Sequence, residues 1–213
     1  MKEKEIRTNG IVGLQQVPGS GEWLWGSDYT HGDLFEAEEL FRMGHRIKKN
    51  RLILVHTGSG DVLEPVPAKE GQYFGAPYAC DGDVMILYVD FTEKEIRVSR
   101  YAPHEHKNAI IYRHSLTEVK NCYNLMLHGY PLMLTRQAEN RFQILWLETV
   151  DFPIDPQETF CCRNENLLYF SKWFEDPDYR EEVVIRDLET GKILEQRAGS
   201  FYDTVGNEIW ILC

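Results

Sequence analysis

The sequence lacks several features that would assign the protein to a compartment outside the cytoplasm. Its first ten residues, MKEKEIRTNG, contain no apolar core of the kind that a signal peptide needs. No apolar run approaches the roughly 20 residues that are needed to span a bilayer. The five cysteines are odd in number, and no two of them have C-x-x-C spacing. These absences predict a cytoplasmic protein whose cysteines remain reduced.

Positive charge is also scarce. The chain has 34 acidic and 23 basic side chains among 213 residues, which gives a formal net charge of −11. Nucleic-acid binding depends on clustered Lys and Arg, and the one such cluster is HRIKK, from His45 to Lys49. The negative field therefore argues against nucleic acids and anionic membranes as partners. It favours a protein, a peptide or a small neutral ligand, and it leaves the oligomeric state open.

What the chain does contain is a repeated pattern of short strands. Four segments each consist of a β-rich run, a short polar turn and a second run, as a β-hairpin requires. These segments begin at Arg51, Glu95, Arg141 and Glu181, so their spacings are 44, 46 and 40 residues. Two further runs, divided by a turn that contains Gly or Asn, precede each hairpin. A period of about 44 residues with four strands is typical of a propeller blade.

We therefore predict a single all-β domain over residues 1–213, a five-bladed β-propeller-like repeat of four-stranded antiparallel sheets. The last blade has two C-terminal strands around a turn at Gly206-Asn207, and an N-terminal strand is expected to close it because an open edge is sticky. The repeats are approximately 11–66, 72–116, 121–155, 159–197 and 200–213, the last closed by residues 1–9. A β-sandwich or a Greek-key barrel uses the same alternation of strands and turns, and both stay open as alternatives.

One segment, Thr30 to Asn50 in the first repeat, interrupts the strand pattern. Asp33 is placed to cap the free amides of a first helical turn, and apolar residues follow it at helical spacing. Gly44 is typical of a residue that ends a helix. The pattern predicts one short helix, from Leu34 to Met43. Since loops on rigid scaffolds commonly carry function, we expect this insertion to mark the binding face, unless its helix plugs the central channel.

The candidate ligand-binding residues lie in the strand before this insertion and at its start. They are Trp23, Trp25, Asp28, Tyr29 and His31. Trp23 and Trp25 share one strand face, where indole rings either stack on a sugar or fill the space between sheets, and packing is the commoner role. A pair of hydrolytic carboxylates would have to come from Asp28, Asp90 and Glu148, although no motif singles these residues out.

The sequence contains no strong motif for a metal or a nucleophile. Asp28, His31 and Asp33 lie within six residues, but their spacing matches no metal loop, and a solvated acidic helix start explains them and the glutamates that follow. His104 and His106 fall in a loop of an outer hairpin and are interpreted as a solvated turn. No G-x-S-x-G motif occurs. We expect no catalytic residue, no metal ion and no cofactor.

The predicted function is a non-enzymatic binding or interaction module that uses the loop face bearing residues 30–50. The alternative is a carbohydrate-acting hydrolase or a lectin that uses carboxylates and aromatic rings at the central channel. A hydrolase requires two carboxyl groups about 5 to 10 Å apart in one pocket. A binding module requires an apolar or aromatic hollow without such a pair.

Overall fold

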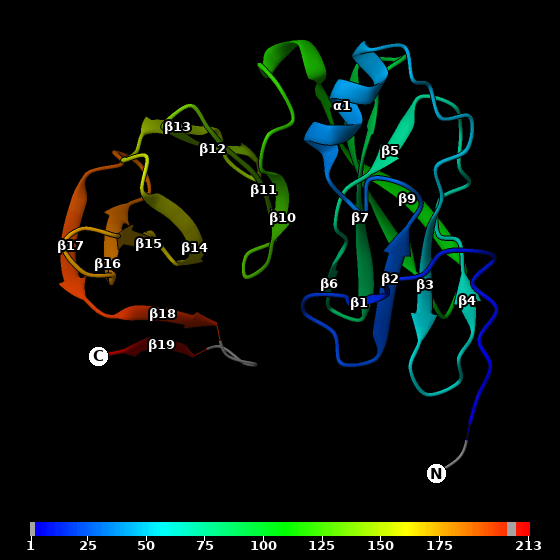
Figure 1. Cartoon of the computed structure of the whole chain (residues 1–213), viewed down its shortest axis with the longest axis horizontal. Coiled ribbons are helices and arrows are strands. Elements are labelled where there is room, and N and C mark those ends of the chain that lie inside the picture. Colours follow the sequence, from blue (N-terminus) through cyan, green and yellow to red (C-terminus); the bar gives the residue numbers. More distant parts are fainter. Residues whose placement is uncertain (1–2, 204–207) are drawn as a thin grey trace. The chain divides into compact units, whose positions relative to one another are not determined.

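The computed structural model describes residues 3–203 and 208–213, and nearly all of its regular structure is β (Figure 1). The chain divides into two compact units, Met1–Leu127 and His128–Cys213. Antiparallel sheets of four or five strands make up most of the fold, and in these sheets the strands mostly follow one another in chain order. This order confirms the predicted all-β class and the predicted strand–turn–strand pattern.

The first sheet is a four-stranded meander in the order β1-β2-β3-β4. Its strands are β1 (Gln15–Gln16), β2 (Trp23–Ser27), β3 (Leu52–His56) and β4 (Val62–Leu63). The insertion separates β2 from β3, yet the two strands still pair directly, with Trp25 opposite Leu54. The long connection therefore does not disturb the sheet.

The second sheet has five strands, one more than the predicted repeat. They are β5 (Gln72–Phe74), β6 (Tyr78–Cys80), β7 (Asp83–Asp90), β8 (Glu95–Ala102) and β9 (Lys107–Ser115). The sequence pattern indicated one strand before β7, whereas the structure has β5 and β6, which both pair with β7. Pro77 lacks the N–H that a continuous strand needs. At Gly75 a Cβ would lie 3.0 Å from the side chains of Leu34 and Leu87, so the backbone passes close to both, and a larger residue would require them to shift.

Two more four-stranded meanders follow along the chain. The first consists of β10 (Leu125–His128), β11 (Met133–Ala138), β12 (Arg141–Trp146) and β13 (Val150–Pro153). The second consists of β14 (Glu158–Asn164), β15 (Leu167–Phe174), β16 (Arg180–Asp187) and β17 (Ile193–Ala198). A single turn of 3-10 helix, η1 (Leu116–Glu118), lies between β9 and β10.

The last sheet is a hairpin of β18 (Ser200–Asp203) and β19 (Ile209–Leu212). Its predicted turn, Gly206-Asn207, lies outside the described residues. The described N-terminal residues, 3–9, form no strand, so they do not supply the predicted closing strand. No closed barrel or propeller is detected in the parts of the chain that the structure describes. The five-bladed ring therefore stays a prediction.

Within each unit, neighbouring sheets pack through side chains that alternate along the strands, as a period of two requires. The core of the first unit joins the sheets β1–β4 and β5–β9 through Val17, Trp23, Trp25, Leu52, Leu54, Val66, Phe74, Ala79, Val84, Ile86, Tyr88 and Tyr101. The core of the second unit contains Met133, Phe142, Ile144, Phe152, Ile154, Phe160, Leu168, Phe170, Val184 and Leu188. Both cores are rich in aromatic rings, which bury large apolar areas.

The insertion folds as predicted around one helix, α1 (Leu34–Arg42), which ends one residue earlier than expected. Its Phe41 ring stacks on Phe91 at 5.3 Å, and the Ile47 N–H donates to the Tyr73 hydroxyl at 3.2 Å. The insertion therefore covers the end of the second sheet where β5 begins and β7 ends. In the described residues no helix is long and apolar enough to cross a bilayer.

Candidate functional site

A cavity of about 260 Å³ lies in the first unit beside the start of α1. Three segments line it: residues 32–35 at the helix start, Ala76 between β5 and β6, and residues 122–126, which lead into β10. Small-molecule sites commonly occupy about 300–1,000 Å³. This cavity lies just below that range and has room for one group of side-chain size.

The first wall of the cavity is the N-terminus of α1. Asp33 is the N-cap, and its Oδ1 accepts from the Phe35 N–H at 2.9 Å and from the Glu36 N–H at 3.0 Å. Gly32 precedes it with φ of 92°, and a Cβ there would lie 2.7 Å from the Trp25 indole. A larger residue at Gly32 would be strained and would clash. The Trp25 ring therefore supports this wall from the core side.

The second wall is the turn that joins Cys122 to Leu125. The Leu125 N–H donates to the Cys122 carbonyl at 3.2 Å, and Asn124 has φ of 47°, a conformation that asparagine tolerates. The Tyr123 ring meets Phe35 edge to face, with the ring centroids 5.4 Å apart. Tyr123 is 47% exposed and Met126 is 44% exposed, so these two side chains form an accessible rim.

A buried carboxylate holds the two walls together. Glu38 of α1 is only 5% exposed, and its Oε2 accepts from the Cys122 N–H at 2.7 Å. Its other oxygen is paired with Arg42 one turn along the helix. The sequence pattern predicted a solvated acidic helix start, and this prediction is wrong for Glu38. A buried charge is retained only where it is paired and hydrogen-bonded, and both conditions are met here.

The five predicted ligand-binding residues do not line this cavity. Trp23 and Trp25 are buried in the core of the first unit, which supports the packing interpretation of their rings. Tyr29 and His31 are exposed, and both have positive φ in the turn before α1. Asp28 lies at the end of β2 and is only partly exposed. A role for these residues in ligand binding stays a prediction.

The three candidate hydrolytic carboxylates each hold an arginine. Asp28 makes two contacts to Arg51, of 2.8 and 3.1 Å, and this hydrogen bonding raises the pKa of Arg51. Glu148 is bound in the same two-pronged way by Arg163, at 3.0 and 3.1 Å. Asp90 contacts Arg97 at 3.3 Å. Each of these carboxylates is held by its own arginine, so the three do not form a pair that faces one pocket, as a hydrolase would need.

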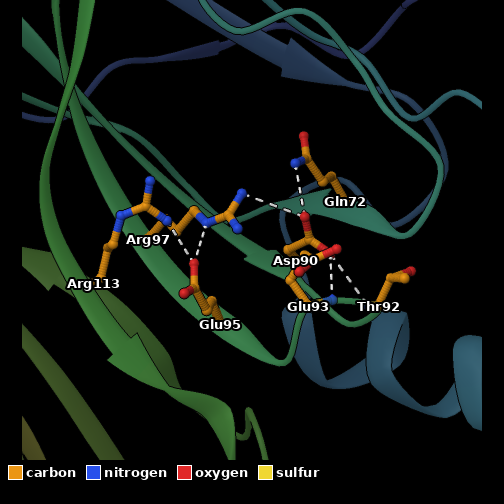
Figure 2. Close-up of polar contacts among 7 residues, drawn as sticks. All are labelled: Gln72, Asp90, Thr92, Glu93, Glu95, Arg97 and Arg113. Atoms are coloured by element: carbon orange, nitrogen blue, oxygen red, sulfur yellow. Dashed lines mark hydrogen bonds and ion pairs between the residues drawn. The ribbon is translucent and has the colours of Figure 1, made fainter.

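Asp90 is the centre of a buried polar network at the end of β7 (Figure 2). Its Oδ2 accepts from Gln72 Nε2 at 2.9 Å and from the Arg97 guanidinium at 3.3 Å. Its Oδ1 accepts from the backbone N–H groups of Thr92 and Glu93, at 3.1 and 2.9 Å. The carboxylate thus fixes the β7–β8 turn, which is a structural role.

The network continues across the sheet through Glu95 (Figure 2). Arg97 Nε donates to Glu95 Oε2 at 2.7 Å, and Arg113 of β9 donates to the same oxygen at 2.6 Å. The hydrogen bond from Arg97 is the main cause of the lowered pKa of Glu95, and Arg113 adds to it. The chain of contacts therefore cross-links four strands, β5, β7, β8 and β9, at one end of the second sheet.

Metal-ligating residues do not converge in the described part of the chain. There, no group of three His, Cys, Asp or Glu side chains has the geometry to hold a metal ion. His104 is exposed in the β8–β9 loop, and His106 Nδ1 lies 3.3 Å from the Tyr101 hydroxyl. None of the five cysteines is joined in a disulfide.

The cavity lining combines aliphatic and aromatic walls with one carboxylate, Asp33, that already caps a helix. Such a site can hold an apolar group and attract a nearby cation, but it offers no second acid for bond cleavage. Segment 122–126 had no signal in the sequence, because its role depends on contacts with the distant helix α1. No protein-family model matches the chain, and no curated protein matches it in sequence.

Proposed function

We propose that this protein is a non-enzymatic binding module whose cavity beside α1 receives one apolar side chain of a partner polypeptide. The chemical make-up of the cavity carries this proposal. Its walls are formed largely by Leu34, Phe35, Tyr123, Leu125 and Met126, around a volume of about 260 Å³. A hollow of this size and polarity suits a single buried anchor, and such anchors dominate the energetics of interfaces.

The charges around the cavity favour an anchor that is flanked by basic residues. Asp33 lines the cavity and is exposed, and Glu36 follows it on the same exposed turn of α1. No Lys or Arg is among the lining residues, all of which are described, and the whole chain carries a formal charge of −11. Complementary potentials speed association and select partners. We therefore expect an apolar side chain with Lys or Arg beside it.

The alternative of a carbohydrate-acting hydrolase receives no support from this site. Retaining and inverting glycosidases use two carboxyl groups that flank the scissile bond. Asp33 is the only carboxyl group in the cavity lining, and it is engaged by two backbone amides. A binding function does not need the second carboxyl group that a hydrolase would need and that this cavity lining lacks.

Synthetic peptides test the proposal directly. The probes are Ac-Lys-Lys-X-Lys-Lys-amide, with Leu, Phe, Trp or Ala at X, added to isotope-labelled protein and followed by backbone amide NMR. We expect the three large residues at X to shift the amides of residues 32–35 and 122–126, and Ala to shift them much less. The proposal fails if no large residue at X perturbs these amides, or if Ala is equally effective.

Two methionines supply a matched control. Met126 lines the cavity, whereas Met43 lies at the end of α1, is 68% exposed and does not line it. Met126→Lys should abolish the peptide-induced shifts, and Met126→Glu should preserve part of them because it adds negative charge. Met43→Lys and Met43→Glu should leave binding almost unchanged. If substitutions at Met126 and Met43 changed peptide binding equally, the peptides would be attracted to the charge of the whole surface, and no side chain would be inserted in the cavity.

A further inference from the structure

The C-terminal hairpin has apolar side chains on both faces. One face, with Phe201, Ile209 and Ile211, packs against β15 and β16. The other face is open: Tyr202, Trp210 and Leu212 are 53%, 51% and 53% exposed, and the rings of Tyr202 and Trp210 stack 6.4 Å apart. Large apolar side chains that gather on one exposed face commonly mark an interaction site.

The hairpin is also the smallest sheet of the fold. The other four sheets have four or five strands each, whereas β18 and β19 form a sheet of two (Figure 1). A two-stranded sheet is marginal by itself, and its free backbone groups can pair with a further strand. With two strands, this sheet has half as many strands as each of the four-stranded meanders in this chain.

The last strand of each larger sheet, β4, β9, β13 or β17, has a feature that disfavours further pairing. The edge strand β4 has two residues, and β13 ends at Pro153. In β9 and β17 the register slips by one residue, which leaves bulges at Ile111 and Leu194. Short strands, prolines and bulges are the devices that keep sheet edges from joining. By contrast, β19 (Ile209–Leu212) has no proline, no charged residue and no slip in its register.

We propose that β19 pairs antiparallel with β19 of a second copy of this chain. Two hairpins then form one four-stranded antiparallel sheet across a two-fold axis, which matches the strand number of the other meanders. Antiparallel self-pairing is isologous, so one patch serves both copies. The four residues that would pair, Ile-Trp-Ile-Leu, carry no charge. The nearest acid is Glu208, directly before β19, and its carboxylate accepts a hydrogen bond from Trp210 Nε1 at 3.0 Å.

The N-terminal segment of the same chain is the competing occupant. Residues 3–9 form no strand, and Ile6 packs beside Ile11, Ile53 and Val55 in the first unit. This segment is therefore engaged with the first sheet. A strand from a different protein is the remaining competitor, and it would leave the purified chain monomeric.

Sedimentation velocity over a wide range of protein concentration tests the proposal. We expect the wild-type chain to reach twice the mass of one chain as concentration rises. Trp210→Lys and Leu212→Lys change exposed side chains and should raise the dimer dissociation constant at least about tenfold. Leu194→Lys is the matched control, because Leu194 is 59% exposed on a bulged edge of the same unit, and it should leave the dimer intact. Far-UV circular dichroism checks that every variant is folded.

Hydrogen exchange locates the contact. In the dimer, those backbone amides of residues 209–212 that point away from β18 should exchange slowly, and this protection should fall on dilution and in the two Lys variants. A wild-type chain that stays monomeric at its highest soluble concentration overturns the proposal. So does a dimer that both Lys variants leave intact. Protection of these amides in a monomer would also overturn it, since a segment of the same chain would then cover β19.

Discussion

The stability of the second unit should fall as the pH is lowered, because His128 is held neutral in the folded chain. His128 ends β10, and its ring meets Phe160 edge to face, with the centroids 4.9 Å apart. Burial lowers the pKa of this imidazole from 6.5 to about 4. Removal from water disfavours the charged ring, and no neighbouring charge is needed to explain the direction.

The sign and size of the effect follow from proton linkage. Below pH 6.5 the unfolded chain binds a proton at this histidine, whereas the folded chain does not bind it until about pH 4. Protonation of this histidine in the unfolded chain therefore does not lower the free energy of unfolding above pH 6.5, and it lowers it progressively as the pH falls towards 4. The difference in pKa corresponds to at most about 3 kcal/mol, and less to the extent that water reaches the partly exposed ring.

Urea unfolding at a series of pH values, with and without His128→Phe, measures this contribution. The phenylalanine does not titrate, so the variant should lose less stability than the wild type between about pH 7 and about pH 4.5. Carboxylates that also titrate are common to both chains and cancel in the difference. His104→Gln is the control, since His104 is exposed and belongs to the first unit. The reasoning is refuted if the imidazole of His128 titrates near 6.5 by NMR, or if both chains show the same pH dependence.

Two substitutions in the first unit test the structural account of the cavity. Trp25→Ala should lower the free energy of unfolding by roughly 3–5 kcal/mol, because it removes a ring that is buried in the core. Urea unfolding measures this change. A loss below about 1 kcal/mol would contradict the packing role of the ring. Glu38→Ala should cost about 1–3 kcal/mol, because it leaves the buried Cys122 N–H without its acceptor, whereas Glu38→Gln keeps an acceptor and should cost less. Hydrogen exchange at the Cys122 amide checks the contact directly. Faster exchange in Glu38→Ala but not in Glu38→Gln would confirm it, and equal exchange rates in these two variants would argue against it.

The helix and the strand order were predictable because their signals are local. Asp33 caps amides two and three residues away, and Gly44 follows the helix end with φ of 79°. Strands separated by short turns pair with their neighbours in sequence, so the meanders follow from the pattern of runs and turns. The helix ends one residue earlier than predicted because the bonding after Met43 is no longer α-helical. The Gly44 N–H donates to the Phe41 carbonyl at 3.1 Å, and the His45 N–H donates to the Leu40 carbonyl at 2.9 Å.

The split of the strand over Gln72–Cys80 was not predictable from its residue types alone. Its apolar and aromatic residues favour one continuous strand, and Gly75 and Pro77 do not indicate how the chain resumes. In the structure both halves return to β7, because β7 is long enough to pair with each of them in turn. The available edge of a neighbouring strand thus decided the outcome.

Residues that are close along the chain specify the all-β class, the repeated strand pattern and the capped helix of the insertion, so these features could be predicted from the amino-acid sequence. Tertiary structure alone decided where a cavity lies and which acids are buried. Glu38 and Cys122 are 84 residues apart, and only folding brings this carboxylate to that amide. Asp28 and its arginine partner, Arg51, are 23 residues apart and also meet only in the folded chain. A local pattern cannot specify such contacts, since burial and charge pairing depend on the surfaces that distant segments present to one another.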